Sequence, residues 1–149
     1  MESDDTTAKL HELDLVYNKI DKLYYGFARS CGLSSCAYWM LYEVAAEGSV
    51  ALVELTEAWA YSKQTINSAL KALQDKGLIE LSFAEGSRKN KVAALTEAGR
   101  KFARKNLEPA MEAEHRAFEM LSAEEREQLA CLMGRYAACL DNELSKLAL

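Results

Sequence analysis

Side chains that hydrogen-bond to nucleic-acid bases recur on one face of a helix predicted near the middle of the chain. The apolar residues of this segment repeat at helical spacing and predict a buried stripe: Ile66, Ala69, Leu70 and Leu73. The polar residues point away from that stripe: Lys63, Gln64, Thr65, Asn67, Ser68 and Lys71. Asn, Gln and Thr bond to base edges in the major groove of DNA, and Lys binds phosphates. The pattern favours a DNA recognition helix, with an ordinary amphipathic surface helix as the alternative.

Both ends of this helix carry recognisable capping residues. Ser62 can accept hydrogen bonds from the free amides of the first turn, and Gly77 can adopt the left-handed conformation that closes the last turn. Ser62 also lies close enough to the polar face to be counted among the expected DNA contacts. The sequence therefore predicts a helix that begins after Ser62 and ends before Gly77.

A short β-hairpin is predicted directly after the helix. Residues 78–83 and 92–95 have the composition of strands, and the intervening residues 84–91 include Gly and Ser for a turn. The hairpin tip also carries Arg88, Lys89, Asn90 and Lys91. Cations on such a wing would reach the phosphates or the minor groove beside a recognition helix. The alternative is a solvated charged loop.

The helix and wing in this order resemble the MarR family of bacterial winged-helix transcription regulators. Residues 62–79 are similar to the family's recognition-helix block with its closing Gly-Leu-Ile, and residues 87–99 to the wing that leads into Leu-Thr-x-x-Gly. The chain departs from the family pattern at three positions: Ser87 replaces the wing's usual Asp, Lys89 its typical Arg, and Glu80 a frequent basic residue. The resemblance implies a dimer that represses transcription by occupying its operator and is released by an effector, often an aromatic or phenolic compound.

Length and composition agree with a small regulator. The chain has 149 residues, half of them hydrophobic, and we expect one domain over residues 1–149. The expected fold is mainly α with a small β-wing, class α+β: a winged helix-turn-helix lobe at 33–95 with dimerisation helices at 8–31 and 96–149. No apolar run is long enough for a signal peptide or a membrane span, so we expect a cytoplasmic protein without a membrane partner.

The charge distribution supports a DNA partner although the net charge is −5. From Ser62 to Lys105 there are ten Lys or Arg and four Asp or Glu, which gives +6 and leaves −11 for the rest of the chain. The last four of these cations, Arg100, Lys101, Arg104 and Lys105, follow the wing and could meet phosphates or simply keep the surface soluble. The basic charge thus falls on the segment predicted to read DNA.

The remaining residues predict helices, roughly at 8–30, 35–46, 51–58, 96–121 and from Ser122 onward. Thr96 can cap the fourth helix, Pro109 should bend it, and Ser122 with Glu125 fits a capping box. The last helix has an apolar stripe too long for local packing: Leu129, Leu132, Met133, Tyr136, Leu140, Leu144 and Leu147. We therefore expect a homodimer on a pseudo-palindromic operator in double-stranded DNA.

Two inputs could regulate such a dimer. Aromatic residues lie where the resemblance implies an effector cleft, with core packing as the alternative: Tyr24, Tyr25, Tyr38, Trp39 and Tyr42. The rival input is oxidation at Cys31 and Cys36, because a thiol near a helix N-terminus can have a lowered pKa. Apart from this possibility, we expect all four cysteines to be reduced thiols. We expect Cys131 and Cys139, on the last helix, to be small buried residues.

Other classes of function receive little support. The chain has two histidines, no Gly-rich phosphate loop and no nucleophile motif, so we expect neither an enzyme nor a cofactor. The cysteines lack metal-binding spacing, so no metal site is expected. A winged helix used to dock another protein remains the non-enzymatic alternative, and it would not need the cation-rich wing.

Overall fold

The computed structural model describes residues 2–57 and 61–147 and divides into two compact units at the Leu107–Glu108 bond. The described residues of the first unit, which runs to Leu107, form five α-helices, a π-helical turn and a three-stranded sheet. Those of the second unit, from Glu108 to residue 147, form two helices. The described part of the chain is mostly helical with one small sheet, as the sequence predicts.

The first unit begins with α1 (Glu2–Ser30), α2 (Ser35–Glu47), β1 (Ser49–Ala51) and α3 (Leu52–Glu57). It continues with α4 (Lys63–Asp75), β2 (Ile79–Phe83), β3 (Lys91–Leu95), α5 (Glu97–Phe102) and the π-helical turn η1 (Ala103–Leu107). Helix α1 starts earlier than predicted. Acidic residues such as Asp5 in the early turns suit the positive end of the helix dipole and support this extension.

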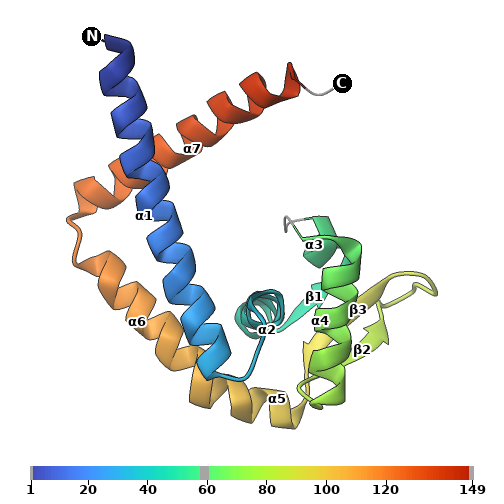
Figure 1. Cartoon of the computed structure of the whole chain (residues 1–149). Helices are drawn as coiled ribbons and strands as arrows, with labels where there is room; N and C mark the ends of the chain where they lie inside the picture. The colour runs from blue at the N-terminus through green and yellow to red at the C-terminus, as the bar shows by residue number, and fades with distance from the viewer. Residues whose placement is uncertain (1, 58–60, 148–149) are drawn as a thin grey trace. The chain divides into compact units, whose positions relative to one another are not determined.

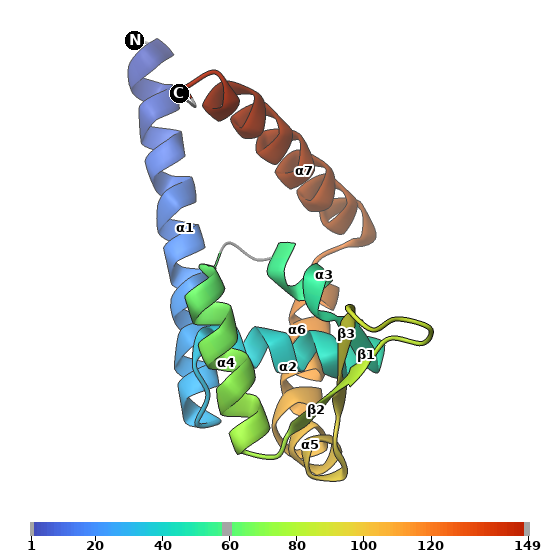
Figure 2. The same ribbon diagram turned by 90° about the vertical axis from the view of Figure 1, so that its right-hand side faces the viewer.

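The sheet has the order β1-β3-β2, with both pairs antiparallel. Strand β1 was not predicted, because three residues are too few to show an alternating pattern; it pairs with β3 through Val50 opposite Ala93. The predicted third helix is present as α3, and its predicted end at residue 58 lies outside the described residues. Figure 2 shows the loop between β2 and β3 projecting away from the lobe.

Helix α2 lies at the centre of the core. It contacts α1, α4, β1, β3 and η1, and Figure 1 shows it end-on between α1 and α4. Its buried residues include Tyr38, Leu41 and Val44, which meet Ile66 and Leu73 in the same cluster of fully buried side chains. The core therefore holds the buried stripe of α4 and leaves the opposite face of that helix outside.

The helix predicted from Thr96 to Leu121 is interrupted. Thr96 caps α5 as predicted, but η1 separates α5 from α6 (Glu108–Glu119). Pro109 has no N–H, and its ring would clash with the carbonyl four residues earlier, so a wider turn just before it relieves the conflict.

The second unit consists of α6 and α7 (Ala123–Ser145). Its α7 begins with the predicted capping box: the Ser122 hydroxyl accepts from the Glu125 N–H at 3.1 Å, and the Glu125 carboxylate accepts from the Ser122 N–H at 2.7 Å. Neither helix has a buried residue in this single chain. No helix in residues 2–57 and 61–147 is long and apolar enough to cross a membrane.

Candidate nucleic-acid interface

Helix α4 presents a polar face opposite a buried one, as predicted. Ile66, Ala69, Leu70 and Leu73 are buried. All six residues of the predicted polar face are exposed: Lys63, Gln64, Thr65, Asn67, Ser68 and Lys71. Because Gln64, Asn67 and Lys71 are three or four residues apart, they follow one line along the helix surface. Hydrogen-bonding groups and charge are therefore available on a surface anchored from behind by the core.

The first turn of α4 uses two of the predicted contact residues in its own cap. The Ser62 hydroxyl accepts from the Thr65 N–H at 3.1 Å, and the two side-chain oxygens lie 2.9 Å apart. Ser62 is therefore the predicted N-cap, and Thr65 shares its hydroxyl with that cap. The neighbouring Lys63, Gln64 and Asn67 lie on the exposed surface with no part in this cap.

The C-terminal end of α4 is tied to the start of α5. Gly77 has a φ of 67°, as predicted for a left-handed closing residue, and the Leu78 N–H donates to the Leu73 carbonyl at 2.9 Å. The Thr96 hydroxyl donates to the Gly77 carbonyl at 2.5 Å and accepts from the Gly99 N–H at 2.9 Å. One side chain thus joins the end of α4 to the cap of α5.

Gly99 completes this connection through close backbone packing. A Cβ atom built there would lie 1.9 Å from the Leu78 carbonyl oxygen, and the Thr96 N–H donates to that same oxygen at 3.1 Å. These contacts account physically for Thr96 and Gly99 in the Leu-Thr-x-x-Gly segment. The sequence analysis identified this segment but did not predict its contact with the end of α4, because Thr96 and Gly77 are about twenty positions apart in the chain.

Ser87 organises the tip of the wing. The hairpin ladder extends through the Ala84 N–H, which donates to the Asn90 carbonyl at 2.8 Å. The Ser87 hydroxyl accepts from the N–H groups of Lys89, at 3.2 Å, and Asn90, at 2.9 Å. Ser at this position therefore supplies the side-chain acceptor that an Asp would supply in the same turn.

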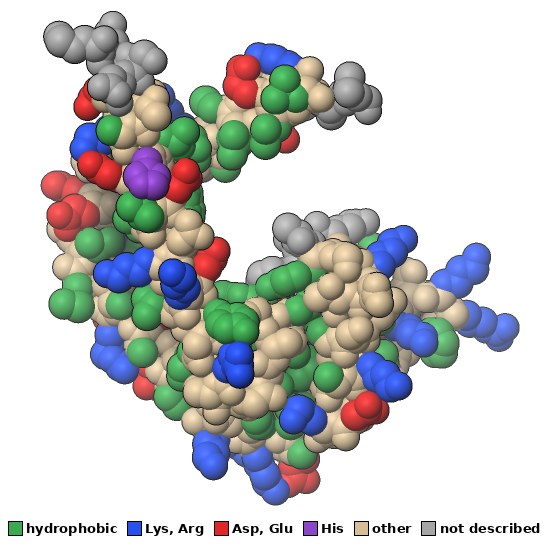
Figure 3. Space-filling model, viewed as in Figure 1, with side chains coloured by type: hydrophobic (Ala, Val, Ile, Leu, Met, Phe, Trp, Pro, Cys, Tyr) green, Lys and Arg blue, Asp and Glu red, His purple; other side chains and the backbone are tan. Residues whose placement is uncertain are grey.

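Cations gather on the wing and on α4. Arg88, Lys89 and Lys91 are exposed, as are Lys63 and Lys71. Figure 3 shows Lys and Arg side chains projecting from this part of the lobe. Positive charge and hydrogen-bonding side chains thus occur together on α4 and the adjacent hairpin, which is an arrangement suited to phosphates and base edges.

Two of the four basic residues after the wing have partners within the chain. Arg100 donates to the Leu95 carbonyl at 2.8 Å, and Lys101 forms an ion pair with Glu97 at 2.9 Å. Arg104 and Lys105 are exposed on η1. Arg100 therefore supports the junction between β3 and α5, in addition to any contact with phosphates.

Four of the five aromatic residues predicted to line an effector site lie together. The Trp39 ring centroid lies 4.7 Å from that of Tyr24 and 5.4 Å from those of both Tyr38 and Tyr42. Tyr38 is only 1% exposed and is a core residue, whereas Tyr24, Trp39 and Tyr42 are half-buried. Tyr25 has a different environment: it is exposed and its hydroxyl accepts from Arg29 at 3.2 Å.

The cysteine environments bear on the redox alternative. All four cysteines are free thiols, and Cys131 and Cys139 are exposed on α7 in this single chain, not buried as predicted. Burial raises the pKa of the Cys36 thiol, which reduces the thiolate available for reaction with an oxidant. The lowered pKa that a helix N-terminus suggested for Cys36 is therefore not found. Cys31 is partly exposed.

Tyr61 is a residue near the interface that sequence reasoning missed. It is half-buried directly before the cap of α4 and packs against the core. Burial raises the pKa of its hydroxyl, and the acidic groups of Cys36 and Asp21 raise it further because a negative charge nearby disfavours the phenolate. Residues on α1 and α2 thus act electrostatically on Tyr61, although no local sequence pattern connects the three. Within the described ranges, no group of three or more His, Cys, Asp or Glu could hold a metal ion.

Comparison with known proteins identifies the relatives of this arrangement. Residues 32–89 match the sequence model of the MarR family. A MarR family regulator from Neisseria meningitidis, NMB1585, has a similar structure: TM-score 0.80, 26% identity, covering 94% of this chain and 99% of that one. AbsC, a MarR family transcriptional regulator from Streptomyces coelicolor, has TM-score 0.74 at 22% identity, with 93% and 96% covered.

A third solved structure contains DNA. It is a mutant MarR from E. coli complexed with operator DNA, with TM-score 0.66 and 17% identity, covering 85% of this chain and 91% of that one. No match was found among curated protein sequences. The first two solved structures each cover more than nine-tenths of this chain, so the similarity extends beyond the residues that match the family model.

Proposed function

We propose that the chain is a homodimeric transcription regulator that binds specific DNA sequences. The premise is its resemblance to the MarR family, whose sequence model it matches over residues 32–89 and whose regulators share its fold. The observation that carries the proposal is the pairing of α4 with the wing. The buried stripe of α4 anchors a face that carries Gln64 and Asn67, and the adjacent hairpin carries Arg88 and Lys89. The operator complex of the E. coli relative supports double-stranded DNA as the partner.

The two parts of the interface have different tasks. Gln64, Thr65, Asn67 and Ser68 read base edges, because the N-terminal residues of a recognition helix enter the major groove. Lys63, beside them in the first turn, supplies positive charge to the DNA backbone. The other cations bind phosphates or the adjacent minor groove: Lys71, Arg88, Lys89 and Lys91. The cap residue Ser62 and the tip residue Asn90 complete the proposed surface. Bound at a promoter, the protein represses transcription by occupying the operator.

A titration with DNA tests this function. Purified protein is titrated by fluorescence anisotropy against fragments from upstream of its own gene and against scrambled controls, at about 50 and 200 mM salt. We expect tight binding to one fragment, weakened at the higher salt. The variant Arg88→Ala with Lys89→Ala should lose affinity for specific and scrambled DNA alike and should reduce the salt slope by about two, because each phosphate contact contributes about one.

The outcomes separate the proposal from its alternative. If lowering the salt concentration does not tighten binding to either upstream or random DNA, the protein is a docking module and not a DNA-binding regulator. A double variant that keeps the full affinity and salt slope would remove the wing from the interface. The matched control is Lys9→Ala with Lys19→Ala on α1, which removes two exposed cations far from α4 in the sequence.

The terminal helices support dimer formation. Within this single chain α1 exposes Leu15, Ile20 and Leu23. A longer exposed series runs along α7 and ends just after it: Leu129, Leu132, Met133, Tyr136, Leu140, Leu144 and Leu147. Monomeric proteins rarely leave such extended apolar faces in water. A second copy covers both faces and, through its two-fold axis, presents two recognition helices to successive major grooves roughly 34–36 Å apart.

Sedimentation measures this assembly. We expect a single species of twice the chain mass at micromolar concentration, and Leu132→Glu together with Leu140→Glu should shift it to monomer because each change places a charge in an apolar interface. Glu127→Gln, on the same helix but outside the apolar series, should leave the dimer intact. A stable monomer of the unmodified protein would contradict the arrangement.

The half-buried ring cluster supports an aromatic effector. Tyr24, Trp39 and Tyr42 combine apolar faces with polar edges, which suits an aromatic acid or phenol that binds one state of the dimer better than the other. Benzoate at saturation should weaken operator binding by about 5- to 150-fold, the range of typical allosteric coupling. Trp39→Leu should remove this response, whereas Tyr25→Leu, outside the cluster, should retain it. Unchanged operator affinity and unchanged melting temperature with aromatic acids would exclude this effector class.

A further inference from the structure

Phe83 lies on the core-facing side of β2 but outside the core. In a strand, residues two apart share a face, so Phe83 continues the line of Ile79 and Leu81. Ile79 is buried and Leu81 packs against the core, but Phe83 is 57% exposed and is absent from the core cluster. Phe83 therefore lies where the hairpin leaves the lobe, and packing in the core does not explain an aromatic residue at this position.

Lys91 is the direct cross-strand partner of Phe83. The two residues are paired in the register of β2 and β3, and the Lys91 ammonium nitrogen lies 5.9 Å from the centre of the Phe83 ring. The next pair towards the tip is joined by the Ala84 N–H and the Asn90 carbonyl, which makes Phe83 and Lys91 a pair without mutual backbone hydrogen bonds. Side chains approach most closely in pairs of this type.

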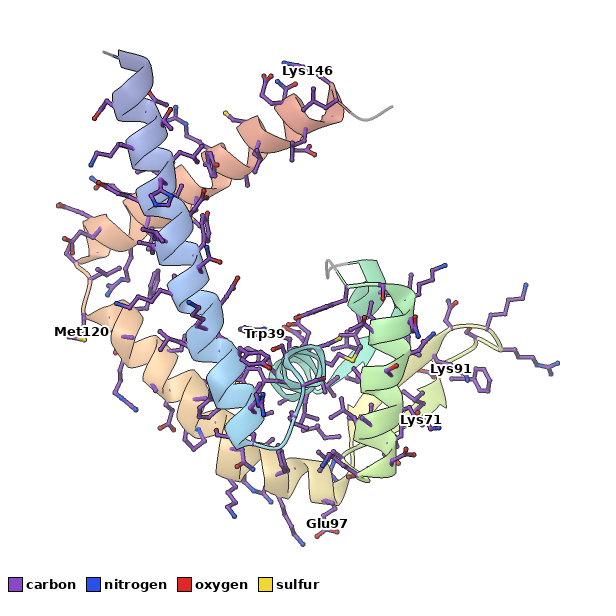
Figure 4. The ribbon with its side chains drawn as sticks, in the orientation of Figure 1. Trp39, Lys71, Lys91, Glu97, Met120 and Lys146 are labelled. Atoms are coloured by element: carbon purple, nitrogen blue, oxygen red, sulfur yellow. The ribbon has the colours of Figure 1, made fainter. Side chains whose placement is uncertain are left out.

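The position of this pair relates it to the proposed DNA surface. Figure 4 shows Lys91 on the hairpin and Lys71 on α4 lying on the same side of the lobe. Beyond this pair, the tip of the hairpin is held by the Ser87 hydroxyl, which accepts from the backbone N–H groups of Lys89 and Asn90. A lysine has a flexible side chain of four methylene groups, so an ammonium group that rests on a ring is more restricted in position than a free one.

We propose that Phe83 is a positioning residue for DNA binding: its ring holds the Lys91 ammonium group at the base of the wing, where it binds a backbone phosphate. This inference rests on the proposed function and adds a residue to it. The Lys91 ammonium group binds the negatively charged DNA backbone irrespective of base sequence, and the ring only restricts its position. The contact therefore adds affinity and salt dependence, and it adds no discrimination between sequences.

The test measures how the affinity for a random-sequence DNA duplex depends on salt. Lys91→Met should reduce the slope of log affinity against log salt by about one, as expected for one lost phosphate contact. Phe83→Leu keeps an apolar side chain without a ring; it should weaken binding about two- to fivefold, the strength of an exposed cation–ring contact, and should lower the slope in the same direction. Phe83→Tyr keeps the ring and should behave like the unmodified protein.

A double-mutant cycle gives the second readout. If Phe83 acts through Lys91, Phe83→Leu should cost nothing further in the Lys91→Met background. A slope unchanged by Phe83→Leu, or equal losses in both backgrounds, would overturn the positioning role while DNA binding by the unmodified protein stood. The absence of salt-dependent DNA binding in the unmodified protein would overturn this inference and the proposed function together. Circular dichroism checks that each variant is folded, which is expected because Phe83 is outside the core.

Discussion

Replacing Gly99 by Ala should destabilise the protein by about 3 kcal/mol, the upper part of the range for overpacked sites. The new Cβ would lie 1.9 Å from the Leu78 carbonyl oxygen and 2.9 Å from its carbon. Both atoms belong to the backbone, so no side-chain rotation relieves the overlap. Ala normally favours a helix over Gly by about 1 kcal/mol, and that gain is too small to offset the clash.

The displacement required by this variant falls on the surface proposed to bind DNA. Leu78 follows the closing residue of α4, and Thr96 bonds to both Gly77 and Leu78. Moving α5 away from Leu78 would loosen these bonds and change how α4 and the wing are held. We therefore expect DNA affinity to fall even at temperatures where the variant is folded.

Thermal unfolding at a fixed protein concentration measures the effect, because the melting temperature of a dimer depends on concentration. Gly26→Ala is the matched control: Gly26 lies within α1, and a Cβ there meets no atom within 4 Å. That change should be neutral or slightly stabilising. Equal melting temperatures for the two variants would mean that the close approach of Gly99 to Leu78 is not a constraint on this fold.

Replacing Asn67 by Ala should reduce the preference for the operator over random DNA by about 1–3 kcal/mol, the contribution of one good bidentate contact to a base. Asn67 is exposed, takes no part in the α4 cap, and lies in line with Gln64 and Lys71. Ala favours a helix over Asn, so the loss cannot be attributed to unfolding of α4. Gln64→Ala should act in the same way.

Two variants on the same helix serve as controls for this prediction. Lys63→Ala removes charge and should weaken binding to operator and random DNA nearly equally, with a smaller salt slope. Gln74→Ala removes an exposed amide from the other end of α4 and should change neither affinity nor preference. Anisotropy titrations with both kinds of DNA give the two affinities for each variant. Equal losses on both DNAs for Asn67→Ala would assign base reading to other residues.

The features of α4 follow from its sequence because they are local. Helical spacing separates Ile66 and Leu73 from Gln64 and Asn67, and the Ser62 cap needs only a hydroxyl three residues before the amide it accepts from. The same reasoning predicted the Thr96 cap, the Ser122 capping box and the antiparallel hairpin. These features depend on residues within a few positions of one another, so their patterns are visible in the chain.

Features that join distant segments were decided by the tertiary structure. The three residues of β1 become a strand only because β3 offers a partner, and Cys36 is buried because the core forms around α2. Pro109 alone also did not predict the wider turn of η1, because a kink, a break or a π-turn would each relieve the same clash.

The division between the two kinds of feature explains the candidate site. The sequence alone predicted the candidate DNA contacts, because residue type and helical or strand spacing are local properties. The tertiary structure decided how those residues are held: Gly99 against Leu78, Thr96 on Gly77, and Lys91 over Phe83. These contacts depend on the packing of α5 against the end of α4 and on the register of β2 and β3, and only the folded chain brings those elements together.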